Sequence, residues 1–239
     1  ENVFRGCGKL KQFIVKDSNP NFKANDGVLF SKDGTKLIRY PMGKDAATYA
    51  IPDGTEVIAE AAFMLPAGIN STSKLTKVTF PTSLQKIEDG AFRQSSLTEV
   101  ELPAVKYGSY VFDCSKSLTT VTTAGGLTKI PDKAFWGCEN LKNVTLGASV
   151  NTIGKSAFER CGFASIDLTN VTEIGDYAFY FSKLEEVTVP ATTKTGKGAF
   201  MNCPALTKAT VNGTTLDPYM FFYCTSLETL TAENITTIE

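Results

Sequence analysis

The sequence predicts an α/β repeat solenoid: a right-handed superhelix with a parallel β-sheet on its concave side, short helical turns on its convex side and one β-hairpin insertion. Three observations support this fold class. An Ala-Phe dipeptide recurs along the chain, further apolar positions keep a fixed spacing from each Phe, and a short alternating segment follows. One such coil cannot bury its apolar face alone, whereas a stack of coils can.

The Ala-Phe dipeptide sets the register of the repeat. Together with the variants Val-Phe and Met-Phe, it places phenylalanines at Phe63, Phe92, Phe112, Phe135, Phe158, Phe179, Phe200 and Phe221. From Phe92 onward the spacings are 20, 23, 23, 21, 21 and 21 residues. This period lies in the range of roughly 20–29 residues that is typical of leucine-rich repeats.

Each repeat contains two further segments. An isoleucine precedes most of the phenylalanines by five positions, as Ile153 precedes Phe158, and this interval predicts a helical turn on the outer side because it is too short for a free-standing helix. Alternating segments predict strands with one buried face, often ended by proline. These segments are Val78–Phe80, Val100–Leu102, Val144–Leu146, Ile166–Leu168 and Val187–Val189. The apolar pattern is broken at Tyr107, Thr195 and Ala209.

One segment interrupts the rhythm at residues 16–47. Two apolar runs, Gly27–Phe30 and Leu37–Tyr40, flank Asp33 and Gly34. Apolar runs around Asp-Gly are the strongest short-range signal for a hairpin, so we expect a β-hairpin that projects from the first coils. A second, shorter insertion is expected at Leu65–Ser73.

The ends of the sequence fall inside the repeat. The chain opens just before Phe4, within a turn, and closes at Ile238 and Glu239, where the next Phe is almost due. Solenoids need polar capping repeats, and neither end resembles one. We therefore expect one solenoid domain of about ten coils over residues 1–239, truncated at both ends.

The run from Ile153 to Cys161 (Ile-Gly-Lys-Ser-Ala-Phe-Glu-Arg-Cys), followed by a Val-Thr-Leu type of strand, resembles the BspA-like leucine-rich repeats. The insertion Asn19–Pro41 is similar to an insert common in that family. The resemblance implies a cell-surface or secreted protein of a Bacteroides-type, host-associated bacterium, with a role in adhesion and host interaction. It provides no catalytic residues.

Composition excludes several kinds of chemistry. The chain has no histidine, so Ser-His-Asp triads and His-ligated metal sites are excluded within it. Lys and Arg number 24 against 25 Asp and Glu, which argues against nucleic acid as a partner. No apolar run approaches the roughly 20 residues of a membrane helix, so no membrane insertion is expected in this fragment. Glu99 and Glu101 share an exposed face, but such neighbours more often solvate a surface than form a glycosidase pair. We expect no enzyme, no cofactor and no metal.

The six cysteines occupy one repeat slot, with Cys114 displaced by one position. Disulfides between neighbouring coils are compatible with a strand spacing of roughly 4.7–4.9 Å, but parallel side-chain directions disfavour them. The sequence contains no Cys-x-x-Cys pair, which would be the usual indication of a metal site. The pattern therefore predicts reduced, buried, structural cysteines.

Two surfaces are candidates for binding. On the concave face, the residues between the inward-pointing ones should point to solvent and form two polar columns. They are Lys77, Thr79, Glu99, Glu101, Thr120, Thr122, Asn143, Thr145, Ser165, Asp167, Glu186, Thr188, Lys208 and Thr210. The alternative is that threonine merely stabilises an exposed sheet. The second surface is an aromatic stripe on the flank, formed by Trp136, Tyr180, Phe181, Phe222 and Tyr223, for which packing between coils is the alternative.

These features favour a non-enzymatic recognition scaffold that binds an extracellular protein of the host or of other bacteria. A glycan-binding surface accessory protein is the first alternative, because sugar rings stack on exposed aromatic side chains. A rigid spacer that presents another domain is the second.

Overall fold

The computed structural model describes residues 3–4, 6–65 and 73–239, and the insertion expected at Leu65–Ser73 therefore lies almost entirely outside the described residues. The chain forms two compact units, residues 1–100 with 105–118 and residues 101–104 with 119–239. No helix occurs in the described part of the chain, so none there is long and apolar enough to cross a bilayer. A continuous solenoid over 1–239 stays a prediction.

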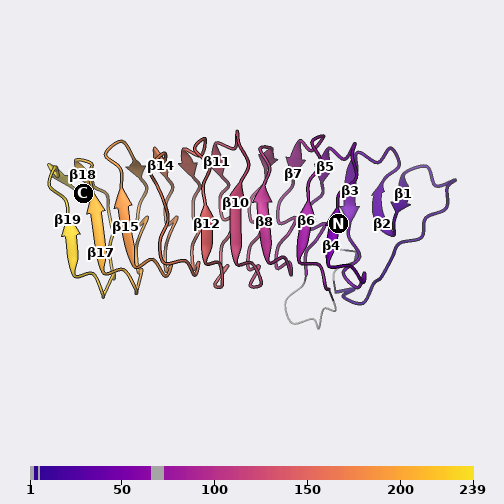
Figure 1. Cartoon of the computed structure of the whole chain (residues 1–239), viewed down its shortest axis with the longest axis horizontal. Helices are drawn as coiled ribbons and strands as arrows, with labels where there is room; N and C mark the ends of the chain where they lie inside the picture. The colour runs from indigo at the N-terminus through magenta and orange to yellow at the C-terminus, as the bar shows by residue number, and fades with distance from the viewer. Residues whose placement is uncertain (1–2, 5, 66–72) are drawn as a thin grey trace. The chain divides into compact units, whose positions relative to one another are not determined.

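The predicted parallel strands are present as the front strands. In the first unit β4 pairs with β6, and in the second unit β10 pairs with β12 and β17 lies between β15 and β19 (Figure 1). The register joins equivalent positions of successive coils, as in the pairing of Val187 with Ala209 and of Ala209 with Leu230. The front strands are β4 (Thr48–Ala50), β6 (Lys77–Thr79), β8 (Glu99–Leu102), β10 (Thr120–Thr123), β12 (Asn143–Thr145), β15 (Glu186–Val189), β17 (Lys208–Val211) and β19 (Thr229–Thr231).

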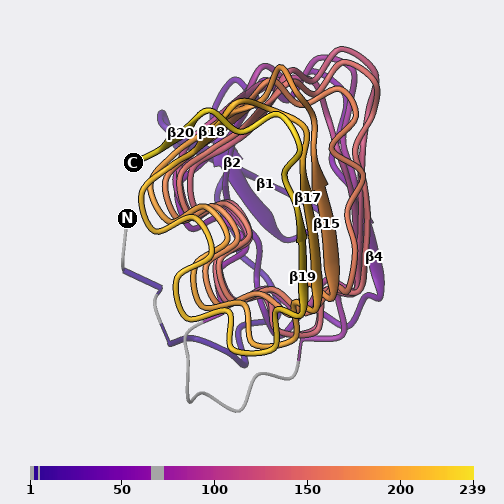
Figure 2. The same ribbon diagram turned by 90° about the vertical axis from the view of Figure 1, so that its left-hand side faces the viewer.

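The prediction of short helical turns is wrong. The residues around the repeat isoleucine form a second set of parallel strands, the back strands, on another side of each coil (Figure 2). They are β5 (Val57–Ile58), β7 (Lys86–Ile87), β9 (Lys106–Tyr107), β11 (Lys129–Ile130), β13 (Thr152–Ile153), β14 (Glu173–Ile174), β16 (Lys194–Thr195), β18 (Thr215–Leu216) and β20 (Thr237–Ile238). Irregular turns, not helices, carry each Phe.

Left-handed residues beside the repeat Phe prevent a helix there. Ser156, two positions before Phe158, has φ of 50°, and Arg160, two positions after it, has φ of 59°. A left-handed conformation costs a non-glycine residue roughly 1–2 kcal/mol, but it turns alternate amide groups toward the next coil. The N–H groups of these three residues donate to the carbonyls of Asp176, Ala178 and Tyr180 at 2.9, 2.8 and 2.8 Å.

The core of each unit is a column of stacked phenylalanines. In the second unit Phe135, Phe158, Phe179, Phe200 and Phe221 stack in succession, with ring centroids 5.4, 5.7, 5.1 and 5.8 Å apart. In the first unit the stack comprises Phe63, Phe92 and Phe112. The repeat Phe therefore points into the core of its unit. Thr195, which replaces the expected apolar residue, donates its hydroxyl to the Asp217 carboxylate.

The glycine four positions before a Phe allows successive coils to approach each other. At Gly154 an added Cβ would lie 2.7 Å from the backbone nitrogen of Asp132 and overlap the Asp132 carboxylate. That carboxylate accepts the N–H of Lys155 at 3.2 Å. The same arrangement joins Gly108, Asp89 and Ser109, and again Gly196, Asp176 and Lys197. Asp and Gly in neighbouring coils thus form one packing motif.

The predicted hairpin is present, with β2 (Val28–Ser31) antiparallel to β3 (Lys36–Arg39). Asp33 organises its turn by accepting hydrogen bonds from the Ser31 hydroxyl and from Thr35, and these bonds lower the pKa of Asp33 to about 2. The expectation that the hairpin projects from the coil is wrong, because β3 pairs in parallel with β5. The sequence reasoning also missed β1 (Phe22–Asn25), which is antiparallel to β2.

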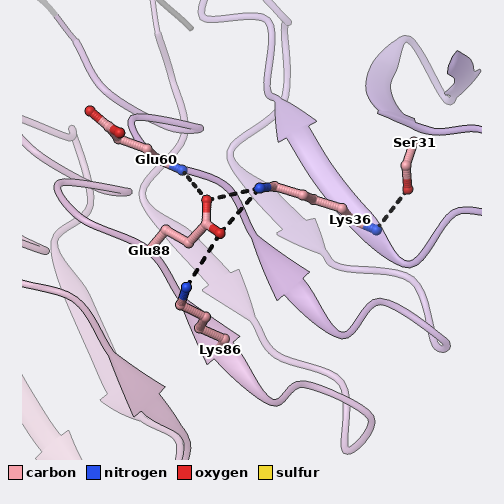
Figure 3. Close-up of polar contacts among 5 residues, drawn as sticks. All are labelled: Ser31, Lys36, Glu60, Lys86 and Glu88. Atoms are coloured by element: carbon pink, nitrogen blue, oxygen red, sulfur yellow. Dashed lines mark hydrogen bonds and ion pairs between the residues drawn. The ribbon is translucent and has the colours of Figure 1, made fainter. Parts of the chain in front are cut away.

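Glu88 connects the insertion to the coils of the first unit (Figure 3). Its carboxylate lies 2.9 Å from Lys36 Nζ on β3 and 3.5 Å from Lys86 Nζ on β7, and it accepts the N–H of Glu60 at 3.1 Å. Partial burial opposes ionisation of Glu88, but the hydrogen bonds from Lys36 and Glu60 and the two lysine charges outweigh it and lower its pKa. The ionised carboxylate therefore stabilises the attachment of the insertion.

Replacing Glu88 with glutamine should destabilise the first unit by roughly 1–2 kcal/mol at pH 7, because the variant loses the charge-assisted hydrogen bonds to Lys36. Since the folded-state pKa is lowered, the contribution of Glu88 is present above its unfolded pKa of about 4.3 and is lost as the pH falls through the folded value. Urea unfolding at pH 7 and at pH 3 should therefore show a difference between variant and parent that shrinks in acid. An equal difference at both pH values would contradict this role.

Candidate functional site

The front face of each unit is the surface formed by its front strands and, in the second unit, also by Ser165–Asp167. These faces carry the fourteen residues that the sequence predicts as binding columns. Within its own unit each of them is exposed or half-buried, as the alternation of the front strands requires. In the first unit Lys77 and Glu99 form an ion pair of 2.6 Å. In the second unit the Asn143 amide donates to the Thr120 hydroxyl at 3.5 Å. The side chains of these residues therefore point outward, whereas ligand binding by them stays a prediction.

One coil of the second unit departs from the expected front sheet. The strand predicted at Ile166–Leu168 is wrong, because no strand is assigned there and the coil lacks an arrow between β12 and β15 (Figure 1). The N–H of Glu185 still donates to the carbonyl of Ala164 at 2.8 Å. Within the part of the chain that the structure describes, the backbones of Ser165, Ile166 and Asp167 make no hydrogen bond. The ladder therefore opens on both sides of this stretch.

The local sequence explains the break. Asp167 accepts the backbone N–H and the hydroxyl of Thr169 at 2.9 and 2.6 Å, and such a local turn competes with a strand ladder. Leu168 and Val171 are also three positions apart, one fewer than the corresponding residues of the preceding coil. The two hydrogen bonds from Thr169 lower the pKa of Asp167, so its carboxylate stays ionised at neutral pH.

The break leaves a groove of about 280 Å³ in the front face. It brings together four of the predicted binding residues, Ser165, Asp167, Glu186 and Thr188. The complete lining is Ser165, Ile166, Asp167, Leu168, Thr169, Glu186, Val187, Thr188 and Pro190. It holds two exposed carboxylates and no basic side chain. Sequence reasoning missed the groove, although the short coil and the Asp-x-Thr pattern were available signals.

The predicted aromatic stripe is partly a packing feature. The guanidinium of Arg160 lies 5.3 Å from the Phe181 ring centroid and 5.9 Å from that of Trp136, so it bridges side chains of successive coils. Trp136 and Tyr180 are half-buried, whereas Phe181, Phe222 and Tyr223 are exposed. Phe222 packs on Tyr223 with ring centroids 4.5 Å apart. Packing between coils accounts for the first half of the stripe, and binding by the rest stays a prediction.

The cysteine slot has a hydrogen-bonding role. Cys161 donates its thiol to the carbonyl of Phe135 in the preceding coil at 3.1 Å, and Ser115 donates its hydroxyl in the same way to Phe92 at 3.0 Å. The slot residue of that coil is Ser115, which explains the displacement of Cys114. Burial raises the pKa of Cys161 well above its usual value. The slot therefore selects a small donor, not only a small apolar side chain.

All six cysteines are thiols in the structure, outside any disulfide bond. The predicted burial is confirmed for Cys138, Cys161 and Cys203. It is wrong for Cys7, which is exposed, and Cys114 and Cys224 are half-buried. Among the described residues, no three Cys, Asp or Glu side chains are placed to hold a metal ion.

Stacked coils with recurring buried positions and a polar front face define a leucine-rich repeat solenoid protein. The chain belongs to the BspA-type leucine-rich repeat family, whose model matches six copies over residues 67–182 and 152–239. Comparison with curated proteins finds no match.

Solved structures of bacterial repeat proteins share this fold. A leucine-rich repeat protein from Eubacterium ventriosum is similar, with a TM-score of 0.74, 25% identity, and coverage of 83% of this chain and 54% of that one. The chain thus spans about half the length of that relative. A leucine-rich repeat protein from Bacteroides ovatus has a TM-score of 0.58 and 20% identity over 92% of this chain and 70% of its own, and it supports the fold alone.

Proposed function

We propose that the protein is a non-enzymatic recognition scaffold at the cell surface or outside the cell, and that it acts in adhesion by binding another protein. The observation that carries the proposal is the front face of the second unit, where polar side chains that the repeat does not need for packing surround a groove. Membership of the BspA-type family supports the extracellular location and the adhesive role.

The polar chemistry of the front face favours a protein over a glycan. Its described strands present hydroxyl, amide and carboxylate groups, and the exposed aromatic rings of the second unit, such as Phe181 and Phe222, are on the turns. Hydrogen-bonding groups spread over several strands suit an extended protein surface. A glycan ligand at the turns is the second candidate, favoured by the exposure of Phe181, Phe222 and Tyr223.

Binding can be tested with arrays of purified extracellular-matrix and bacterial surface proteins, run beside a glycan array. We expect saturable binding to at least one protein, weakened by the front-face variant Thr145→Arg/Thr188→Arg. The matched control is Thr172→Arg/Thr237→Arg, which makes the same two changes at exposed positions on or next to back strands. Binding to glycans alone, with loss on Phe222→Ala, would favour the second candidate. Absence of binding on both arrays would favour a rigid spacer.

A further inference from the structure

The back sheet of the second unit is open between β16 and β18. On one side of this opening, the N–H of Gly196 donates to the carbonyl of Ile174 at 2.7 Å and joins β16 to β14. On the other side, the N–H of Glu239 donates to the carbonyl of Leu216 at 3.1 Å and joins β20 to β18. Over residues 73–239, which the structure describes without a gap, no such bond joins β18 to β16, although the front strands β15 and β17 of the same coils are paired.

Asp217 accounts for the opening. It stands four positions before the repeat Phe, where the three preceding coils have glycine, namely Gly154, Gly175 and Gly196. A Cβ added to Gly196 would lie 2.5 Å from the backbone nitrogen of Asp176 in the preceding coil, so glycine permits close approach there. Asp217 carries a Cβ at the equivalent position, and its carboxylate accepts the hydroxyl of Thr195. The two coils therefore remain apart on this side while they stay joined at the front.

The opening leads into a slot of about 500 Å³ between the two coils. Small residues make room for it, because Thr192 and Gly213 stand at the position of the buried Val150 and Val171 of the two earlier coils. The inner wall of the slot is apolar and consists of the buried side chains of Val189, Val211 and Met220. The volume lies within the range of roughly 300–1,000 Å³ that is typical of small-molecule sites.

The slot presents backbone donors on one side and backbone acceptors on the other. The N–H groups of Thr215 and Asp217 and the carbonyls of Thr193 and Thr195 correspond to groups that pair in the neighbouring coils. Within the described ranges these four groups make no hydrogen bond. Backbone groups that are shielded from bulk water are almost always paired, so the slot favours a ligand that both donates and accepts hydrogen bonds.

The side chains restrict the class of ligand further. The charged residues of the lining are Lys194, Asp217 and Glu239, so the slot has no excess of positive charge that would attract an anion. A metal ion is disfavoured, because hard cations take oxygen ligands and two N–H groups line the same opening. Hydroxyl groups fit, since each one donates and accepts at the same time. A sugar carries several hydroxyls on a ring whose C–H groups can contact an apolar wall.

We infer that the slot binds a single neutral sugar unit, such as the terminal monosaccharide of a glycan. The ring packs against Val189, Val211 and Met220, and its hydroxyls pair with the Asp217 carboxylate and with the open backbone groups. The inference goes beyond the proposed function, which concerns protein binding by the front face. It also places the sugar away from the exposed aromatic rings of the turns.

The test uses nuclear magnetic resonance of the whole, isotope-labelled chain. The probes are the methyl glycosides of glucose, galactose and mannose. We expect at least one of them to shift the amide signals of Thr215 and Asp217 in a saturable way, and its uronic acid counterpart to bind more weakly. If none of the three probes shifted these signals, or if the uronic acid bound more tightly, the inference would be overturned.

Gly213→Val tests whether the slot is the site. A Cβ added to Gly213 lies 3.6 Å from the carbonyl oxygen of Ala191, which is ordinary contact, so the valine can fill the slot without displacing the backbone. It should weaken sugar binding by roughly tenfold or more, because it occupies the space of the ligand. Gly125→Val is the matched control at an open position and should leave the affinity unchanged. Equal affinities of the two valine variants would overturn the slot as the site.

Asp217→Asn keeps the Cβ that holds the coils apart and removes only the charge. The loss of a charge-assisted hydrogen bond should weaken sugar binding roughly tenfold. An unchanged affinity would overturn the assigned role of the carboxylate. On the glycan array, a signal that is lost on Phe222→Ala but kept on Gly213→Val would assign the glycan to the turns and overturn the inference.

Discussion

Replacing Gly154 with alanine should lower the free energy of unfolding of the second unit by roughly 2–4 kcal/mol. The new Cβ would lie 2.7 Å from the backbone nitrogen of Asp132, and backbone atoms cannot move aside as a flexible side chain can. The two coils would have to separate locally, which strains the hydrogen bond from the Gly154 N–H to the Ile130 carbonyl, now 2.9 Å. Urea or guanidinium unfolding measures this change directly.

The chain offers a matched control at Gly125. An added Cβ there meets no atom within 4 Å. Gly125→Ala should therefore change stability by no more than about 0.5 kcal/mol, as expected for an open surface position. If the two alanine variants unfolded at the same denaturant concentration, close contact between coils at Gly154 would not be what requires glycine.

Truncating Phe158 to alanine should cost roughly 3–5 kcal/mol, because the ring is completely buried and its removal leaves a cavity that the coils cannot collapse around. The ring stacks on Phe135 and Phe179 on its two sides, at 5.4 and 5.7 Å. Both neighbours would lose their contacts, so the damage should extend beyond one coil. Hydrogen exchange should show faster opening of the amides of Phe135 and Phe158 than in the parent.

Phe181→Ala is the control for the core truncation. Phe181 has 43% of its surface exposed and contacts the Arg160 guanidinium. We expect a loss of at most about 1 kcal/mol, the usual size of an exposed cation–π contact. A loss as large as that of Phe158→Ala would mean that the turns, and not the phenylalanine column, limit stability.

The buried positions of the repeat could be predicted from sequence because they recur. The equivalents of Phe158 and Cys161 recur along the second unit, with Ser182 in place of the cysteine after Phe179, and their spacing reveals them without a structure. The back strands were missed because each is two residues long, as at Thr152–Ile153, and two residues show no alternation. The left-handed positions were missed because residues such as Ser156 and Arg160 occupy them. A glycine at these positions would have indicated a left-handed conformation.

The binding columns could be predicted in direction but not in shape. Alternation shows that Asp167 and Glu186 point outward, since their neighbours Leu168 and Val187 are buried. The groove depends on the opened ladder at Ser165–Asp167, which is a property of two coils together. The repeat pattern assigns this stretch a strand by analogy with its neighbours, and the turn formed by Asp167 and Thr169 overrides that assignment.

The hydrogen bonds of the turns give each unit a direction. The N–H of Phe158 donates to the carbonyl of Ala178, the peptide group that follows donates through Phe179 to Ala199, and Phe200 donates to Met220. These amides form an unbroken chain along the stack, with every N–H pointing toward the C-terminal side. Dipoles that point the same way add together, as in an α-helix, and each bond polarises the next. This row of bonds therefore has a positive end and a negative end, and the back strands oppose it, because the N–H groups of Gly154 and Gly175 donate to Ile130 and Ile153 in the preceding coils.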